Sequence, residues 1–332
     1  MTVSDFSERD LIARIASRLP PTPAWMPVGI GDDAAVVEPE RNRLEVLSVD
    51  ALVEGIHFDR AFTPPDAIGH RALAANLSDL AAMGAAPRLC LLSLALPGSF
   101  PIADFDAMIG GLTALAARHR VHVAGGNLTR SPGPLVVDIT VSGTAKRRQI
   151  LTRRGARPGD ELYVTGSIGA AAAGLGMLKQ DGLQACTGAN PCAARYLYPE
   201  PRIRMGLLIA RNRAATAGMD LSDGLAEGVQ QMAEASGVGA SIDADALPIE
   251  AAAREWFGRQ GDDVMTAALT GGDDYELLLA VPPRRGRRLN EARQHGGVLL
   301  TRIGVCTKDP AVVLNCGDAG LRPLPKGYQH FR

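Results

Sequence analysis

The sequence contains no long apolar stretch and no excess of charge of either sign. None of its apolar runs reaches the length of a membrane span, and the first twenty residues mix acids and bases without the continuous apolar core of a signal peptide. With 35 basic and 36 acidic residues the formal net charge is −1, so no basic surface for nucleic acid is expected. The basic run at 284–288 is expected to lie on a solvated helix. Neither a membrane nor a nucleic acid is an expected partner.

The cysteines are few and show no motif. Cys90, Cys186, Cys192, Cys306 and Cys316 form no CxxC pair and are odd in number. Thiols in such a pattern are typical of a reducing compartment. We therefore expect a cytoplasmic protein whose cysteines are reduced and mostly buried.

Familiar nucleotide-binding signatures are missing or weak. No GxxxxGK[ST] stretch occurs, which excludes a P-loop site. VTGSIGAAAAGLG at 164–176 is superficially similar to a dinucleotide fingerprint, but its glycines are expected to permit close helix packing instead.

The chain is longer than one hydrophobic core usually requires, so two domains are expected. Strands and helices mix without strict alternation, which favours an α+β class over a doubly wound sheet. In the first half, strands are expected at 44–53, 88–96, 121–126 and 134–145, and helices at 66–84 and 101–119. In the second half, strands are expected at 161–166, 218–222, 240–247, 275–281 and 298–306, and helices at 168–179, 202–213 and 224–236, with two more after residue 247. A basic stretch at 146–162 interrupts the apolar pattern, so we expect domains at 1–148 and 149–332.

Aspartates gather beside glycine or serine at four expected strand ends. These stretches are GIGDD at 29–33, SVDALVEGIHF at 48–58, DLSDG at 220–224 and GGDDYE at 271–276. Asp-Gly pairs form turns readily, and Asp223 could cap a helix that begins at Gly224. Each stretch taken singly therefore also has an interpretation as a turn or a cap.

Asp79 is harder to explain in that way, because it lies inside the small and apolar helix AANLSDLAAMG. Asn76, Asp79 and Met83 share one face of this helix, and no lysine or arginine lies within a helical turn of Asp79. An unpaired buried carboxylate would be very unfavourable. A metal ion would remove the difficulty and would let Asp50 and the acidic pair at 32–33 converge with Asp79.

Oxygen ligands without clustered histidine or cysteine favour Mg²⁺ over zinc. Mg²⁺ held by aspartates commonly serves phosphate chemistry, and neighbouring glycines let main-chain amides approach a polyanion. The residues by themselves therefore favour a Mg²⁺-dependent site that handles phosphate.

Taken in order, these segments resemble the thiamine-monophosphate kinase family, in the superfamily that includes aminoimidazole ribonucleotide synthetase and selenophosphate synthetase. The matching stretches run from Gly29 to Phe331 and are GIGDDAAVV, SVDALVEGIHF, ALAANLSDLAAMGAAP, AGGNLTR, LTRRGARPGDELYVTG, MDLSDGL, LTGGDDYELL and KGYQHF. The resemblance implies a two-domain aminoimidazole ribonucleotide synthetase-like α+β fold. It also implies a homodimer joined through the N-terminal sheets, with ATP and Mg²⁺ bound by the N-terminal domain.

The same resemblance implies an enzyme that phosphorylates thiamine monophosphate to thiamine diphosphate with ATP, using several Mg²⁺ ions. By position, the implied metal ligands are Asp33, Asp50, Asp79, Asp220 and Asp223, helped near Ser48 and Val49, with Asn127 at a further metal position. Asp32 is expected to orient its turn. The implied ATP contacts are Gly126, Asn127, Arg153 and Ser222, and the implied thiamine monophosphate contacts are His57, Asp273 and Tyr328.

Two positions depart from the family pattern. The family commonly has aspartate where this chain has Asn127, so one Mg²⁺ position lacks a charge. Val49 stands where some members have threonine, which leaves a main-chain contact or none. The alternatives are another ATP-using member of the superfamily, such as a cyclo-ligase or selenophosphate synthetase, and a dimeric relative without catalysis.

The acceptor in the implied reaction is a phosphate, which is already ionised near neutral pH. No general base is needed, and none is assigned. We expect direct in-line transfer without a phosphoenzyme.

Overall fold

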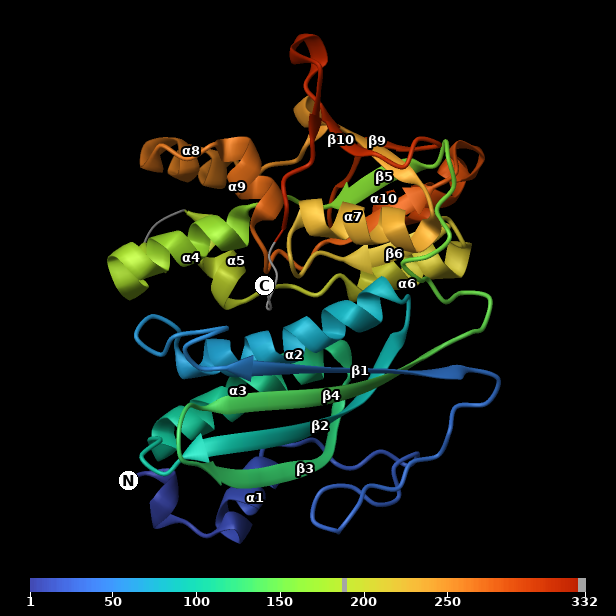
Figure 1. The fold of residues 1–332 in the computed structure, drawn as a ribbon. Coiled ribbons are helices and arrows are strands. Elements are labelled where there is room, and N and C mark those ends of the chain that lie inside the picture. The colour runs from blue at the N-terminus through green and yellow to red at the C-terminus, as the bar shows by residue number, and fades with distance from the viewer. Residues whose placement is uncertain (187–189, 328–332) are drawn as a thin grey trace. The chain divides into compact units, whose positions relative to one another are not determined.

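The structure is a computed structural model that describes residues 1–186 and 190–327. It divides into two compact units (Figure 1). The first contains Met1–Leu80 and Ala86–Lys146, and the second contains Ala81–Ala85 and the chain from Arg147 onward. In the described part of the chain, no helix combines the length and the apolar character needed to cross a membrane.

The first unit is a sheet with helices packed on one face (Figure 1). Its strands are β1 (Leu44–Val53), β2 (Ala86–Pro97), β3 (His122–Ser131) and β4 (Val136–Ala145), in the spatial order β1-β4-β2-β3. Its helices are α1 (Glu8–Ala16), α2 (Pro65–Ala82) and α3 (Ile102–His119), preceded by the 3₁₀ turn η1 (Val3–Asp5). Strand β4 pairs antiparallel with both neighbours, while β2 and β3 run parallel across the α3 connection.

The strand expected at 44–53 is confirmed at both ends, whereas the one expected at 121–126 continues to Ser131. Residues 127–131 are mostly polar, and they extend the strand because β2 pairs with them up to Pro97–Ser131. In β1, buried Val46 and Leu52 point toward the helices, and exposed Leu47 and Val49 point the other way.

Helices α2 and α3 approach each other closely at glycines. A Cβ atom added at Gly69 would overlap the main-chain carbonyl of Met108, and one added at Gly111 would overlap the carbonyl of Asp66. At the adjacent Gly110 nothing lies within 4 Å of an added Cβ. Gly69 and Gly111 therefore set the separation of the two helices.

The second unit is a longer mixed sheet in the order β11-β10-β7-β9-β5-β8-β6. Its strands are β5 (Glu161–Thr165), β6 (Ala217–Asp220), β7 (Gly239–Asp243), β8 (Leu277–Val281), β9 (Leu300–Thr307), β10 (Val312–Asn315) and β11 (Leu321–Pro323). Its α-helices are α4 (Ala170–Asp181), α5 (Pro191–Leu197), α6 (Ile203–Asn212), α7 (Leu225–Ser236), α8 (Ala251–Gln260), α9 (Val264–Thr270) and α10 (Asn290–His295). The 3₁₀ segments are η2 (Gly182–Cys186), η3 (Ala244–Ala246), η4 (Pro283–Leu289) and η5 (Gly317–Ala319).

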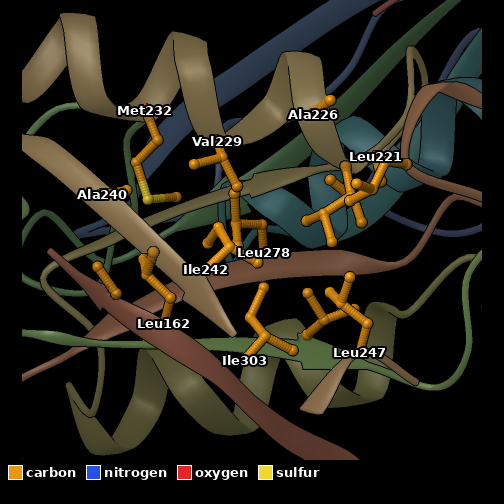
Figure 2. Close-up of a cluster of buried hydrophobic side chains, with 14 of the residues drawn as sticks. Leu162, Leu221, Ala226, Val229, Met232, Ala240, Ile242, Leu247, Leu278 and Ile303 are labelled. Carbon is orange, nitrogen blue, oxygen red and sulfur yellow. The ribbon is translucent and has the colours of Figure 1, made fainter. Parts of the chain in front are cut away.

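The core of the second unit lies between α7 and the sheet (Figure 2). Val229 and Met232 of α7 pack against Leu162, Ile242 and Leu278, which come from three different strands. These side chains are almost completely buried, and removing their apolar surface from water is the main stabilising term for such a layer.

Three local expectations meet different outcomes. The glycines of α4 do permit close packing, since a Cβ at Gly174 would overlap the carbonyl of Cys192 in α5. The arginine run at 284–288 does lie on a solvated helix, the 3₁₀ helix η4, where three of its four arginines are exposed. The fourth, Arg285, donates to the carbonyls of Arg213 and Ala215 beyond the end of α6. Helix α7 begins at Leu225 with Gly224 at its N-cap, so the cap interpretation of Asp223 is wrong.

The packing at α2 and α3 predicts opposite effects for two neighbouring substitutions. Gly111→Ala should lower the free energy of unfolding by about 1–3 kcal/mol, because the added methyl overpacks the helix contact. Gly110→Ala should raise it by about 0.5–1 kcal/mol, because alanine is the better helix former where space is open. Urea denaturation of the two variants measures both values, and equal effects would contradict the packing described.

Candidate functional site

The acidic pair of residues 32 and 33 lies in an exposed loop of the first unit. The loop is closed by a bridge in which Val36 N–H donates to Val28 C=O (2.9 Å). Asp33 N–H donates to the Asp32 carboxylate (2.9 Å), so Asp32 is engaged within its own turn. The carboxylate of Asp33 is exposed beyond that turn.

Strand β1 and helix α2 bring three of the expected residues together. The hydroxyl of Ser48 donates to the Asp79 carboxylate. Asp50 N–H donates to the side-chain oxygen of Asn76 (3.1 Å), and the Asn76 amide donates to Ala72 C=O (3.0 Å). The alternation of β1 explains this, because Ser48 and Asp50 point toward α2. Helix periodicity then places Asn76 and Asp79 one turn apart on the facing side.

Asn76 is a site residue to which sequence reasoning gave no role. Its spacing of three from Asp79 was the available signal, but its partner is the main chain of Asp50, which the sequence does not reveal. Asn76 is fully buried, and a buried amide that loses its partners is costly. It therefore fixes the separation of β1 and α2 at the point where Asp50 and Asp79 emerge.

Val49 and His57 are placed differently from one another. The Val49 side chain is 58% exposed on the opposite face of β1, so only its main chain could serve a ligand beside Asp50. His57 Nδ1 accepts the N–H of Val53 (3.1 Å). Since that nitrogen is an acceptor, the neutral imidazole carries its proton on Nε2 and presents a hydrogen-bond donor there.

Gly126 and Asn127 lie on β3, at the far edge of the sheet from β1. Asp50 lies in one row across the sheet with Ile139, Leu92 and Gly126. Asn127 is the next residue of β3 after Gly126, so its side chain points to the opposite face of the sheet. Three strand spacings amount to about 14 Å, and Mg²⁺ holds its ligands at about 2 Å. Asn127 and Asp50 of one chain therefore cannot bind the same ion.

In the second unit, the DLSDG and GGDDYE stretches lie side by side. Asp273 N–H donates to Ser222 C=O (2.7 Å), Tyr275 N–H donates to Leu221 C=O (3.0 Å), and Leu221 N–H donates to Glu276 C=O (2.8 Å). These bonds continue the β6–β8 pairing beyond Asp220 and Leu277. Asp220, Ser222 and Asp273 thus belong to one hydrogen-bonded structure, and Asp223 follows Ser222 directly. Arg153 instead donates to Gln231 of α7 (2.9 Å).

The backbone of this segment is strained at two residues. Asp273 has φ 66° and Tyr275 has φ 50°, in the left-handed region that favours glycine. Each such residue costs on the order of 1–3 kcal/mol and persists only where its surroundings hold it. The Tyr275 hydroxyl donates to the Asp273 carboxylate (3.1 Å), which joins the two strained residues through their side chains.

Asp274, between them, is buried at the start of α4. Its carboxylate accepts the N–H groups of Gly169 (2.6 Å) and Ala171 (3.1 Å). Burial raises the pKa of Asp274 to about 7, although these two N–H groups and Arg195 act in the opposite direction. The residue attaches the strained segment to α4.

The oxygen chemistry of the expected ligands suits Mg²⁺. Asp33, Asp50 and Asp79 offer carboxylates and Ser48 offers a hydroxyl, all hard donors. Within the described residues, however, no three histidine, cysteine or acidic side chains form a ready-made ligand group. Asp220 and Asp223 belong to the second unit and Tyr328 lies outside the described residues, so the convergence of the whole set stays a prediction.

The raised pKa of Asp274 predicts a pH-dependent stability. Between pH about 4 and 7 the native chain keeps a proton that the unfolded chain, with a pKa near 3.8, has released. The free energy of unfolding should therefore fall as pH rises through this window and level off above it. Urea denaturation of wild type and Asp274→Asn from pH 5 to 8 measures how the free energy of unfolding of each protein changes with pH. A difference between the two proteins that does not change with pH would contradict the prediction.

Comparison with known proteins places this architecture in a family. The model of the N-terminal domain of AIR synthase related proteins matches residues 31–145, and that of the C-terminal domain matches residues 157–317. The thiamine-monophosphate kinase of Escherichia coli K12 is 38% identical over 335 residues, covering 100% of this chain and 99% of the relative. That of Synechococcus elongatus is 40% identical over 307 residues, covering 91% of each chain.

Solved structures agree with these relatives. The thiamine-monophosphate kinase of Stenotrophomonas maltophilia K279a has a TM-score of 0.83 and 38% identity, covering 93% of this chain and 97% of its own. AaThiL complexed with AMPPCP and TMP has a TM-score of 0.77 and 29% identity, covering 100% of this chain and 99% of its own. Escherichia coli HypE, a hydrogenase maturation protein, has a TM-score of 0.79, 20% identity and 98% and 99% coverage, and so shares the fold. On these matches, the chain belongs to the thiamine-monophosphate kinase family of AIR synthase related proteins.

Proposed function

We propose that this chain transfers the γ-phosphoryl group of ATP to thiamine monophosphate, forming thiamine diphosphate and ADP. The observation that carries the proposal is the similarity over both units to thiamine-monophosphate kinases, including AaThiL complexed with AMPPCP and TMP. The hydrogen-bonded groupings of Ser48 with Asp79 and of Ser222 with Asp273 support it, because they gather oxygen ligands in both halves of the chain.

The reaction joins two anions by direct in-line displacement. An ionised oxygen of the substrate phosphate attacks the γ-phosphorus, and the bond from that phosphorus to the bridging oxygen of ADP breaks. The nucleophile carries no proton at neutral pH, so this chain needs no general base. No covalent phosphoenzyme forms, and labelled ATP alone should leave no phosphoryl group on the protein.

The roles of the chain's residues follow from their chemistry. Mg²⁺ would be held by carboxylates and a hydroxyl at Asp33, Ser48, Asp50, Asp79, Asp220 and Asp223, with the Val49 main chain and the Asn127 amide oxygen as further donors. The ions would neutralise charge on the phosphates. Gly126, Asn127, Arg153 and Ser222 contact ATP. His57, Asp273 and Tyr328 contact thiamine monophosphate, and the Nε2–H of His57 suits a phosphate oxygen.

A homodimer through the first unit's sheet is part of the proposal. Leu47 and Val49 of β1 and Leu91 of β2 lie in neighbouring rows of the sheet face away from the helices, and are 68%, 58% and 40% exposed. An apolar patch of this kind is typical of an interface. Within one chain, Asn127 lies about 14 Å from Asp50 across the sheet. In a dimer, the second copy would supply another Asn127.

The cytoplasm is the proposed location. All five cysteines are free thiols, and three of them, Cys90, Cys192 and Cys306, are buried. This supports the expectation of a reducing compartment.

The function is tested by measuring ADP release in a coupled assay with ATP, thiamine monophosphate and Mg²⁺. We expect turnover that depends on both the acceptor and the metal. Asp79→Asn should lower kcat at least about 100-fold, because a neutral amide cannot replace a charged metal ligand, while the unfolding transition stays cooperative. Turnover of Asp79→Asn near the wild-type rate would refute the metal role of this residue.

The dimer is tested by introducing a charge into the exposed sheet face. Leu47→Arg should shift the chain from dimer to monomer in sedimentation velocity, because a charge inside an apolar interface is unfavourable. Leu299→Arg is the matched control, since Leu299 is also highly exposed (79%) but lies in the second unit. A dimer unaffected by Leu47→Arg would rule out this face.

A further inference from the structure

Glu276 is a fully buried carboxylate that the proposed reaction does not use. Arg202 donates to it twice, from Nε (2.7 Å) and from Nη2 (2.5 Å). Arg195 donates from Nη2 (2.8 Å), and the hydroxyl of Thr165 donates as well (2.6 Å). A guanidinium that binds through two parallel N–H groups fixes both the distance and the plane of the pair.

This ion pair is directly connected to the strained segment. Glu276 follows Tyr275 in sequence, and its C=O accepts Leu221 N–H, the residue to which Tyr275 donates. On the other side, Asp274 is attached to the first turn of α4. The left-handed residues 273 and 275 therefore alternate with the buried, hydrogen-bonded carboxylates of Asp274 and Glu276. These two anchors hold the strained backbone in place.

The space around Glu276 is also adapted to this pair. Gly166 has φ 58°, and a Cβ there would overlap the Glu276 carboxylate. Thr165 uses one hydroxyl twice, donating to Glu276 and accepting Leu277 N–H (2.8 Å). A side chain of another length or shape at 276 would not be held in this way.

We propose that Arg202 and Arg195 are positioning residues for the substrate side of the phosphoryl transfer. Through Glu276 they hold Asp273 and Tyr275 in their left-handed conformation and so set the direction of the Asp273 carboxylate. The inference rests on the proposed function, in which Asp273 contacts thiamine monophosphate. Because a carboxylate repels phosphate and attracts cations, Asp273 recognises the thiazolium or the aminopyrimidine of the substrate rather than its phosphate.

The test is Arg202→Lys, which keeps the charge but loses the two-point geometry. We expect KM for thiamine monophosphate to rise roughly tenfold or more, with kcat and KM for ATP within about threefold of wild type. Arg195 is partly exposed and reaches Glu276 through one nitrogen, Nη2, which also donates to Asp274 C=O (3.4 Å). Arg195→Lys should therefore change the same constant in the same direction by a smaller factor. It serves as the test if Arg202→Lys does not fold.

A double-mutant cycle separates positioning from general weakening. Tyr275→Phe removes the hydroxyl that holds Asp273, and it should raise the same KM. If both residues act through the Asp273 carboxylate, the double variant Arg202→Lys, Tyr275→Phe should be about as impaired as the worse single variant. Fully additive effects would overturn the proposal.

Two controls complete the design. Ile242→Val lowers stability from within the core of the second unit and should leave KM unchanged. Arg302→Lys alters the more exposed Arg302–Glu161 ion pair (2.9 Å) and should also leave KM unchanged. A KM rise in Ile242→Val equal to that in Arg202→Lys would overturn the proposal. An active wild type with an unaffected Arg202→Lys would refute the positioning role alone, and an inactive wild type would refute the proposed function with it.

Discussion

A carboxylate that leaves water must receive hydrogen bonds or opposite charge in return, and both units of this chain are organised around that requirement. In the first unit, Ser48 donates to the half-buried Asp79 carboxylate, whereas the Asp50 carboxylate stays exposed to water and its main chain donates to Asn76. In the second unit the partners are charged, because Arg195 and Arg202 bind Glu276. The difference separates two uses of acids. Glu276 is paired with two arginines of its own chain and serves structure, whereas Asp50 and Asp79 are the acids to which we assign a metal in the proposed function.

Long, strongly patterned elements were predictable from the sequence. Strand β1 has the expected ends, because branched apolar residues are frequent along it, and α2 and α3 follow from long stretches rich in alanine and leucine. Strands β10 and β11 were missed, since four and three residues carry too little pattern to distinguish them from loop. The extension of β3 over Asn127 was missed as well, because it depends on main-chain pairing with β2 and not on side-chain hydrophobicity.

The acidic stretches were predictable as a set, but their partners were not. The Ser48–Asp79 bond joins residues 31 apart, and the Arg202–Glu276 bond joins residues 74 apart. Such pairs depend on how strands and helices pack, which no local spacing encodes. The GGDDYE stretch drew attention to its aspartates, and Asp273 was the residue expected to act. The strain at Asp273 and Tyr275 and the anchoring role of Glu276 became visible only with the backbone angles and the buried contacts.

The placement of the arginines also bears on how the two phosphates can be brought together. A kinase whose acceptor is a phosphate must offset more negative charge than one whose acceptor is a hydroxyl. Arg195 and Arg202 lie next to the strained segment, but their guanidinium groups are already bound to Glu276. Positive charge for the phosphates at that segment must therefore come from elsewhere, and aspartates such as Asp220 and Asp223 would recruit it as Mg²⁺. In the proposed function, the acids near the reacting groups would deliver positive charge as bound Mg²⁺, while the two arginines would maintain the geometry in which Asp273 meets the substrate.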